Sequence, residues 1–152
     1  MRSILMTVVV AAGSTTLLAQ MPPVRMGLWE KTVLTSTGEG SPATMKARSC
    51  ITAEQWQEMT SNIQKPHPGC KMDVVKTGNG YTFHGVCTPA AGSSLVMNGS
   101  QTIQDPEHIV SQSQSTTTMN GKVRKIEVHS TSRFLSSSCG SVKPGEPDIE
   151  GK

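Results

Sequence analysis

Residues 70–87 read CKMDVVKTGNGYTFHGVC, and this stretch decides the fold. Two short runs that alternate between apolar and polar residues flank Gly78-Asn79, a dipeptide suited to a two-residue hairpin loop with glycine at the first central position. Counting outward from this loop sets Cys70 opposite Cys87, in a pair of the non-hydrogen-bonded class. Cα atoms in such a pair are ~4.5 Å apart, which a disulfide accepts. The stretch therefore predicts a β-hairpin closed by a disulfide.

The register of this hairpin also divides its side chains between two faces, because successive residues of a strand point to opposite sides. The inward residues are Met72, Val74, Tyr81 and Phe83, and the outward residues are Lys71, Asp73, Thr82 and His84.

The N-terminus predicts export. Arg2 gives a short basic start, residues 4–12 are almost unbroken apolar, and small residues and leucines follow to Ala19. This run is too short to span a bilayer, so it indicates a secretory signal peptide over residues 1–19 rather than a membrane anchor. We expect an exported protein, periplasmic or secreted, with a single domain over residues 20–139 and no transmembrane segment.

All four cysteines of the chain follow this signal. An even number behind an export signal is typical of disulfides. The hairpin geometry selects Cys70–Cys87 and leaves Cys50–Cys139 as the second pair. A four-cysteine zinc site is the alternative, but no Cys-x-x-Cys pair supplies its usual ligand spacing. We therefore expect two disulfides and no metal site.

One helix and seven strands are indicated along the chain. Thr52 and Gln55 form a capping box, and Ile51 and Trp56 form a hydrophobic staple around it. The helix should end near Asn62. The predicted strands are residues 27–34, 43–50, 70–77, 80–87, 95–104, 108–119 and 122–135.

These elements predict an α+β fold. We expect a curved antiparallel sheet of about seven strands, a half-barrel-like meander with the short helix on its concave face and two disulfides. Residues 140–152 are rich in Pro, Gly and acids without periodicity, so they are predicted to be a disordered tail.

The last two long strands, joined by Asn120-Gly121, have a sparse inner face. Their large apolar residues are separated by serines at positions 111, 113, 115, 130 and 132. Either the helix fills these gaps with Trp56, or the gaps form a cavity. The opposite face carries glutamines, threonines and charges and should face solvent.

Catalytic chemistry is not indicated. The histidines occur singly, there is no Gly-x-Ser-x-Gly motif, and the cysteines are assigned to disulfides. Without residues 1–19 the chain keeps 13 of its 14 basic residues against 11 acidic ones, too weak an excess for a nucleic-acid partner. We expect neither an enzyme nor a cofactor.

The order of these motifs resembles the exported bacterial proteins grouped as domain of unknown function family 3617. The resemblance is carried by Gly27-Leu28-Trp29-Glu30, Cys50-Ile51-Thr52, the hairpin cysteines Cys70 and Cys87, and the closing Cys139. It implies a compartment and a scaffold, and no catalytic residues.

Two functional hypotheses remain. The first is a non-enzymatic envelope module that binds a small apolar or amphipathic ligand. Its pocket residues would be the aromatic residues Trp29, Trp56, Phe83 and Phe134, which are otherwise the core. The second is an interaction protein that presents a sheet edge or its polar face to an envelope protein. The sequence indicates no oligomeric state.

Overall fold

The computed structural model describes residues 23–38, 40–63, 65, 68–88 and 90–150. The predicted signal peptide, residues 1–19, lies outside the described residues. The elements in chain order are β1 (Gly27–Ser36), β2 (Ala43–Ile51), α1 (Ala53–Asn62), β3 (Cys70–Thr77), β4 (Gly80–Cys87), β5 (Ser93–Asp105), β6 (His108–Met119), β7 (Lys122–Ser136) and β8 (Asp148–Ile149).

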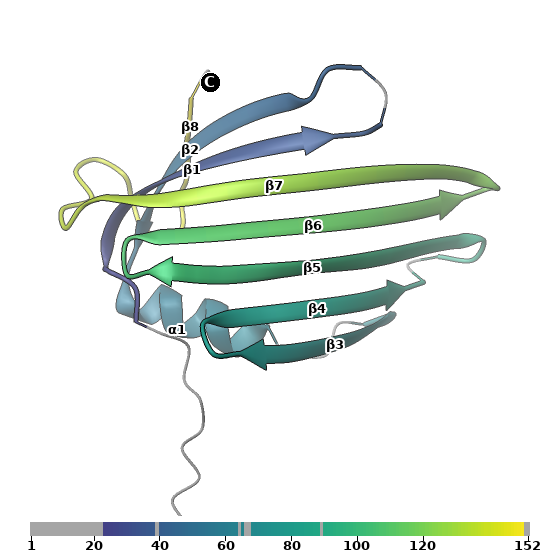
Figure 1. The fold of residues 1–152 in the computed structure, drawn as a ribbon, viewed down its shortest axis with the longest axis horizontal. Coiled ribbons are helices and arrows are strands. Elements are labelled where there is room, and N and C mark those ends of the chain that lie inside the picture. Colours follow the sequence, from purple (N-terminus) through teal and green to yellow (C-terminus); the bar gives the residue numbers. More distant parts are fainter. Residues whose placement is uncertain (1–22, 39, 64, 66–67, 89, 151–152) are drawn as a thin grey trace, which may run out of the picture.

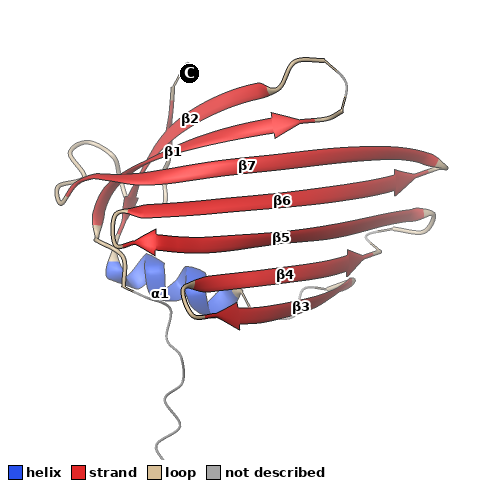
Figure 2. Cartoon of the chain, viewed as in Figure 1, coloured by secondary structure: helices blue, strands red, loops and turns tan. Residues whose placement is uncertain are grey.

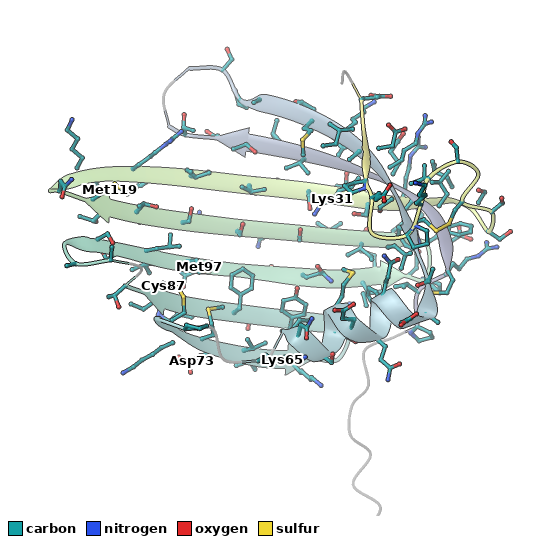
Figure 3. The ribbon with its side chains drawn as sticks, turned by 180° about the vertical axis from the view of Figure 1, so that it is seen from behind. Lys31, Lys65, Asp73, Cys87, Met97 and Met119 are labelled. Atoms are coloured by element: carbon teal, nitrogen blue, oxygen red, sulfur yellow. A yellow bond between two sulfur atoms is a disulfide. The ribbon has the colours of Figure 1, made fainter. Side chains whose placement is uncertain are left out.

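The strands form one open antiparallel sheet in the order β3-β4-β5-β6-β7-β1-β2-β8 (Figure 1). The predicted α+β class with a single helix is confirmed (Figure 2). Strands β3 to β7 follow one another as a meander, and the β1–β2 hairpin adjoins β7. Strand β3 is at one edge of the sheet and β2 is next to the other edge. The segment that connects them must therefore cross one face of the sheet. Helix α1 lies in that segment, in front of the strands in Figure 3.

The predicted register of the β3–β4 hairpin is confirmed. Cys70 pairs with Cys87 and forms a disulfide with a Cα–Cα distance of 4.0 Å. The loop differs in one respect, since Gly78 lacks the positive φ that a type II′ turn requires. Instead, Asn79 fastens the loop to β5: its carbonyl accepts from the Ile103 N–H at 2.7 Å, and its amide donates to the Ile103 carbonyl at 3.3 Å.

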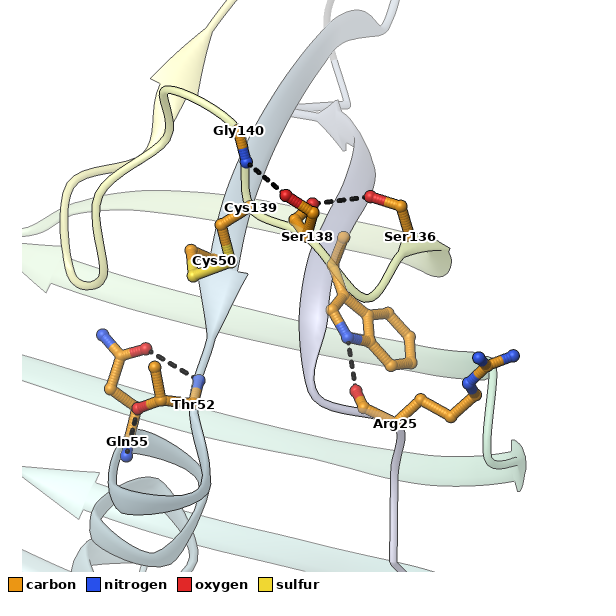
Figure 4. The surroundings of a disulfide bond; sticks show 9 residues. Arg25, Cys50, Thr52, Gln55, Ser136, Ser138, Cys139 and Gly140 are labelled. Carbon is orange, nitrogen blue, oxygen red and sulfur yellow. Dashed lines mark hydrogen bonds between the residues drawn. A yellow bond between two sulfur atoms is a disulfide. The ribbon is translucent and has the colours of Figure 1, made fainter.

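The second disulfide, Cys50–Cys139, joins the end of β2 to the segment after β7 with a Cα–Cα distance of 5.3 Å. The predicted capping box lies beside it (Figure 4). The backbone N–H of Gln55 donates to the hydroxyl of Thr52, and the N–H of Thr52 donates to the side-chain carbonyl of Gln55, both at 3.2 Å. The start of α1 is therefore anchored two residues from a covalent cross-link.

The core is small and lies at one end of the sheet. Its buried cluster comprises Val24, Trp29, Ile103 and Ile109. The Trp29 indole packs edge-on against Phe134, with ring centroids 5.9 Å apart, and donates to the backbone carbonyl of Arg25 at 2.9 Å. At the far end of the sheet, where β6 turns into β7, Cys87 is the only buried hydrophobic residue among those described.

The prediction of a disordered tail is wrong for the described part of residues 140–152. Asp148–Ile149 forms β8 and pairs with Arg48 and Ala47 of β2, and the Glu150 N–H donates to the Lys46 carbonyl at 3.1 Å. The free edge of β2 offers backbone partners that need no side-chain periodicity, so the sequence pattern did not reveal this strand.

The two glycines beside Asn79 provide a test of how closely β4 approaches β5. A Cβ at Gly80 would lie 1.9 Å from the Gln101 carbonyl oxygen, whereas a Cβ at Gly78 would meet nothing within 4 Å. We expect Gly80→Ala to lower the free energy of unfolding by ~1–3 kcal/mol because the strands must separate. Gly78→Ala should change it by less than ~0.5 kcal/mol. Urea denaturation measures both, and equal effects would contradict the close approach of β4 to β5 at Gly80.

The two disulfides should differ in their contribution to stability, because they close loops of different length. The sequence separation is 89 residues for Cys50–Cys139 and 17 for Cys70–Cys87. In the chain-entropy account, replacing the first pair by alanine should cost ~4–5 kcal/mol and replacing the second ~3 kcal/mol. Urea midpoints of the two double variants give the order, and a larger loss for the hairpin pair would contradict it.

Candidate functional site

A cavity of about 300 Å³ lies between α1 and the sheet. Four parts of the chain surround it: the β1–β2 hairpin, the strands β5 to β7, the helix, and the segment before β8. Its lining residues are Trp29, Lys31, Ser49, Cys50, Ile51, Gln55, Trp56, Met59, Gln101, Ile109, Ser111, Ser130, Ser132, Gly145 and Pro147. The walls are mainly apolar, with hydroxyl and amide groups distributed among them.

The cavity exists because α1 does not pack closely on the strands below it. No residue of α1 is buried. Trp56 reaches the edge of the core cluster, but Met59 remains 51% exposed. The helix is held at its first turn by the cap and the disulfide, and it does not close the space beneath.

Serines form the floor of the cavity. Ser111 of β6 pairs with Ser130 of β7, and their hydroxyl oxygens are 2.6 Å apart. Ser132 is the next residue of β7 on the same face. Three of the five predicted serine positions, 111, 130 and 132, therefore line a cavity, whereas Ser113 and Ser115 do not.

The structure brings two of the four predicted aromatic residues into the cavity wall. Trp29 and Trp56 line it, while Phe134 lies behind Trp29 in the core. Phe83 lies away from the cavity beside Tyr81, with ring centroids 6.3 Å apart. Its ring occupies the space that a side chain at Gly99 would need.

Some wall residues were not predicted from the sequence. Lys31 is two residues after Trp29 in β1, so the two-residue period of a strand could have placed it on the same inner face. Gly145 and Pro147 had no comparable signal, because they belong to the tail. A Cβ at Gly145 would lie 3.5 Å from the Gln55 amide nitrogen, so this segment reaches the helix.

An ion pair between β1 and β7 lies on the opposite face of the sheet. An Nη atom of Arg133 is 2.7 Å from an Oε atom of Glu30. This hydrogen-bonded guanidinium lowers the pKa of Glu30 below its ordinary value of 4.5. On the inner face, burial raises the pKa of Tyr81 above 10.0 because the phenolate would lose solvation.

No group of three or more His, Cys, Asp or Glu side chains among the described residues could hold a metal ion. No helix in the same part of the chain is long and apolar enough to cross a membrane.

The family model described as "Protein of unknown function (DUF3617)" matches residues 23–139. The chain belongs to this family. The match includes both disulfides, α1 and seven of the eight strands, but it ends before Gly145 and Pro147. Comparisons with curated proteins and with solved structures gave no match.

The Glu30–Arg133 pair predicts a pH effect of known sign. A lowered carboxyl pKa in the folded state contributes stability above the ordinary value of 4.5, and this contribution is lost as the pH falls through the folded-state pKa. Arg133→Gln should therefore raise the pKa of Glu30 toward its ordinary value. It should also destabilise the protein more at neutral pH than at acid pH. Carboxyl NMR titration measures the pKa, with Arg124→Gln on the same strand as the control. An unchanged Glu30 titration in Arg133→Gln would contradict the assignment.

Proposed function

We propose that the protein is a non-enzymatic module of the cell envelope that binds one small apolar or amphipathic ligand between α1 and the sheet. The observation that carries this proposal is the helix itself, which buries none of its residues above a cavity walled by two tryptophans. A ligand in this space would remove the apolar surface of its walls from water.

The dimensions and chemistry of the cavity support a small ligand. Its volume of about 300 Å³ is at the lower end of the range of ligand pockets, ~300–1,000 Å³. Each buried methylene of a ligand would contribute ~0.8 kcal/mol. The hydroxyl of Ser132 and the amide N–H groups of Gln55 and Gln101 are available for a polar group, whereas the side-chain carbonyls of both glutamines already accept hydrogen bonds.

An envelope location is part of this proposal. Both cysteine pairs form disulfides, which persist in oxidising compartments. Together with the signal peptide expected over residues 1–19, they favour export.

A second candidate function is presentation of a surface to a protein partner. Strand β3 lies at an edge of the sheet, and Val75 on it is 62% exposed. Exposed edges pair readily with another strand. A shallow hollow of about 400 Å³ on the polar face, lined in part by Asn98, Gln112 and His129, would enlarge the available surface.

Filling the cavity tests the binding proposal. Ser132 lines the cavity, and its neighbour Thr131 is exposed on the opposite face of β7. We expect Ser132→Leu to weaken binding of the neutral probe N-phenylnaphthylamine at least tenfold because the side chain takes the ligand's place. Thr131→Leu, the matched control, should leave binding unchanged.

The readout is probe fluorescence, with urea denaturation to show that both variants stay folded within ~1.5 kcal/mol of the wild type. Equal binding by the two variants, or no binding by the wild type, would contradict the proposal.

A further inference from the structure

Lys31 is the only ionisable side chain among the described residues that line the cavity. It lies on β1 between Trp29 and Val33, opposite Ser132 of β7 and Ala47 of β2. The residue is exposed, and Figure 3 labels it on the face that carries α1. Its methylenes can therefore lie along the wall while its ammonium group stays in solvent at the mouth.

No acidic group on the described residues pairs with Lys31. The four ion pairs found there are Arg25–Glu107, Asp105–His108, Glu30–Arg133 and Lys143–Glu146. Glu30 of β1, Asp148 of β8 and Glu150 line a separate hollow with Lys46 and Arg48. Glu146 stands between the lining residues Gly145 and Pro147 and is paired with Lys143. Lys31 is therefore the one cationic side chain among the described residues that line the cavity, and it forms none of these ion pairs.

The two halves of the site call for different parts of one ligand. The apolar wall formed by Trp29, Ile51, Trp56 and Ile109 favours a hydrocarbon chain. The ammonium group of Lys31 favours an anionic oxygen that can remain hydrated on its outer side. The ammonium group would repel a cationic headgroup, and a neutral headgroup would form no ion pair with it.

We propose that the ligand is a free single-chain amphiphile with an anionic headgroup, of which a carboxylate is the simplest, held with its chain in the cavity and its headgroup at Lys31. This inference rests on the proposed binding function and specifies its ligand class. It commits to a monomer from solution, because the cavity of about 300 Å³ has room for one short chain.

The test compares three ligands with the same chain and different headgroups: decanoate, decanol and decylamine. Each displaces N-phenylnaphthylamine from the purified protein with both disulfides formed. We expect decanoate to bind about fivefold tighter than decanol, as for one partly exposed ion pair, and decylamine to bind most weakly. Lys31→Gln should remove the preference, and Lys31→Glu should reverse it in favour of decylamine.

Lys46→Gln is the matched control. Lys46→Gln has the same net charge as Lys31→Gln. Because Lys46 lies on the neighbouring strand and on the opposite face, this variant should keep the wild-type preference.

The outcomes separate this inference from the proposal on which it rests. If decanol binds as tightly as decanoate, or if Lys31→Gln keeps the preference, the anionic-headgroup inference is wrong and the binding function stands. If neither the probe nor any of the three ligands binds, both are wrong. Binding to anionic phosphatidylglycerol vesicles without any response to monomeric decanoate would also overturn the inference, because the charge would then serve a membrane surface.

Discussion

The Cys50–Cys139 disulfide is the constraint on which the rest of the structure depends. It joins the end of β2 to the segment that follows β7. Helix α1 begins just after Cys50, and the segment that carries Gly145 and Pro147 begins just after Cys139. The two segments that cover the cavity, α1 and the residues before β8, therefore both begin next to this disulfide. Helix α1 buries none of its residues, so a space persists between these segments and the strands.

The distribution of apolar side chains explains why the cavity lies where it does. Burial is concentrated around Trp29 and Ile103, which are 1% and 2% exposed. Beyond this cluster, serines separate the large side chains on the inner face of β6 and β7, and the apolar residues there are at most partly buried. Trp56 extends from α1 to the border between these regions, and the cavity forms at that border.

The order of the strands places the helix over the sheet. Since β2 and β3 are consecutive in the chain but lie far apart in the sheet, their connection has to pass across a face. The capping box directs the helix as soon as β2 ends, and the side it takes is the side on which Trp29 and the serines lie. The connection that crosses from β2 to β3 therefore places the helix over the sheet and thereby sets the position of the cavity.

The sequence by itself determined the features that depend on neighbours along the chain. These are the helix cap at Thr52, the register that sets Cys70 opposite Cys87, and the family. Local geometry is sufficient for each, because turns, caps and strand alternation act over a few residues. Only the tertiary structure decided that β1 pairs with β7, that Asp148–Ile149 adds an eighth strand, and that Lys31 lies at the mouth of a cavity while Phe83 does not line it. Those outcomes depend on which strand edges meet and how far a helix stands from a sheet, and no local pattern encodes such distances.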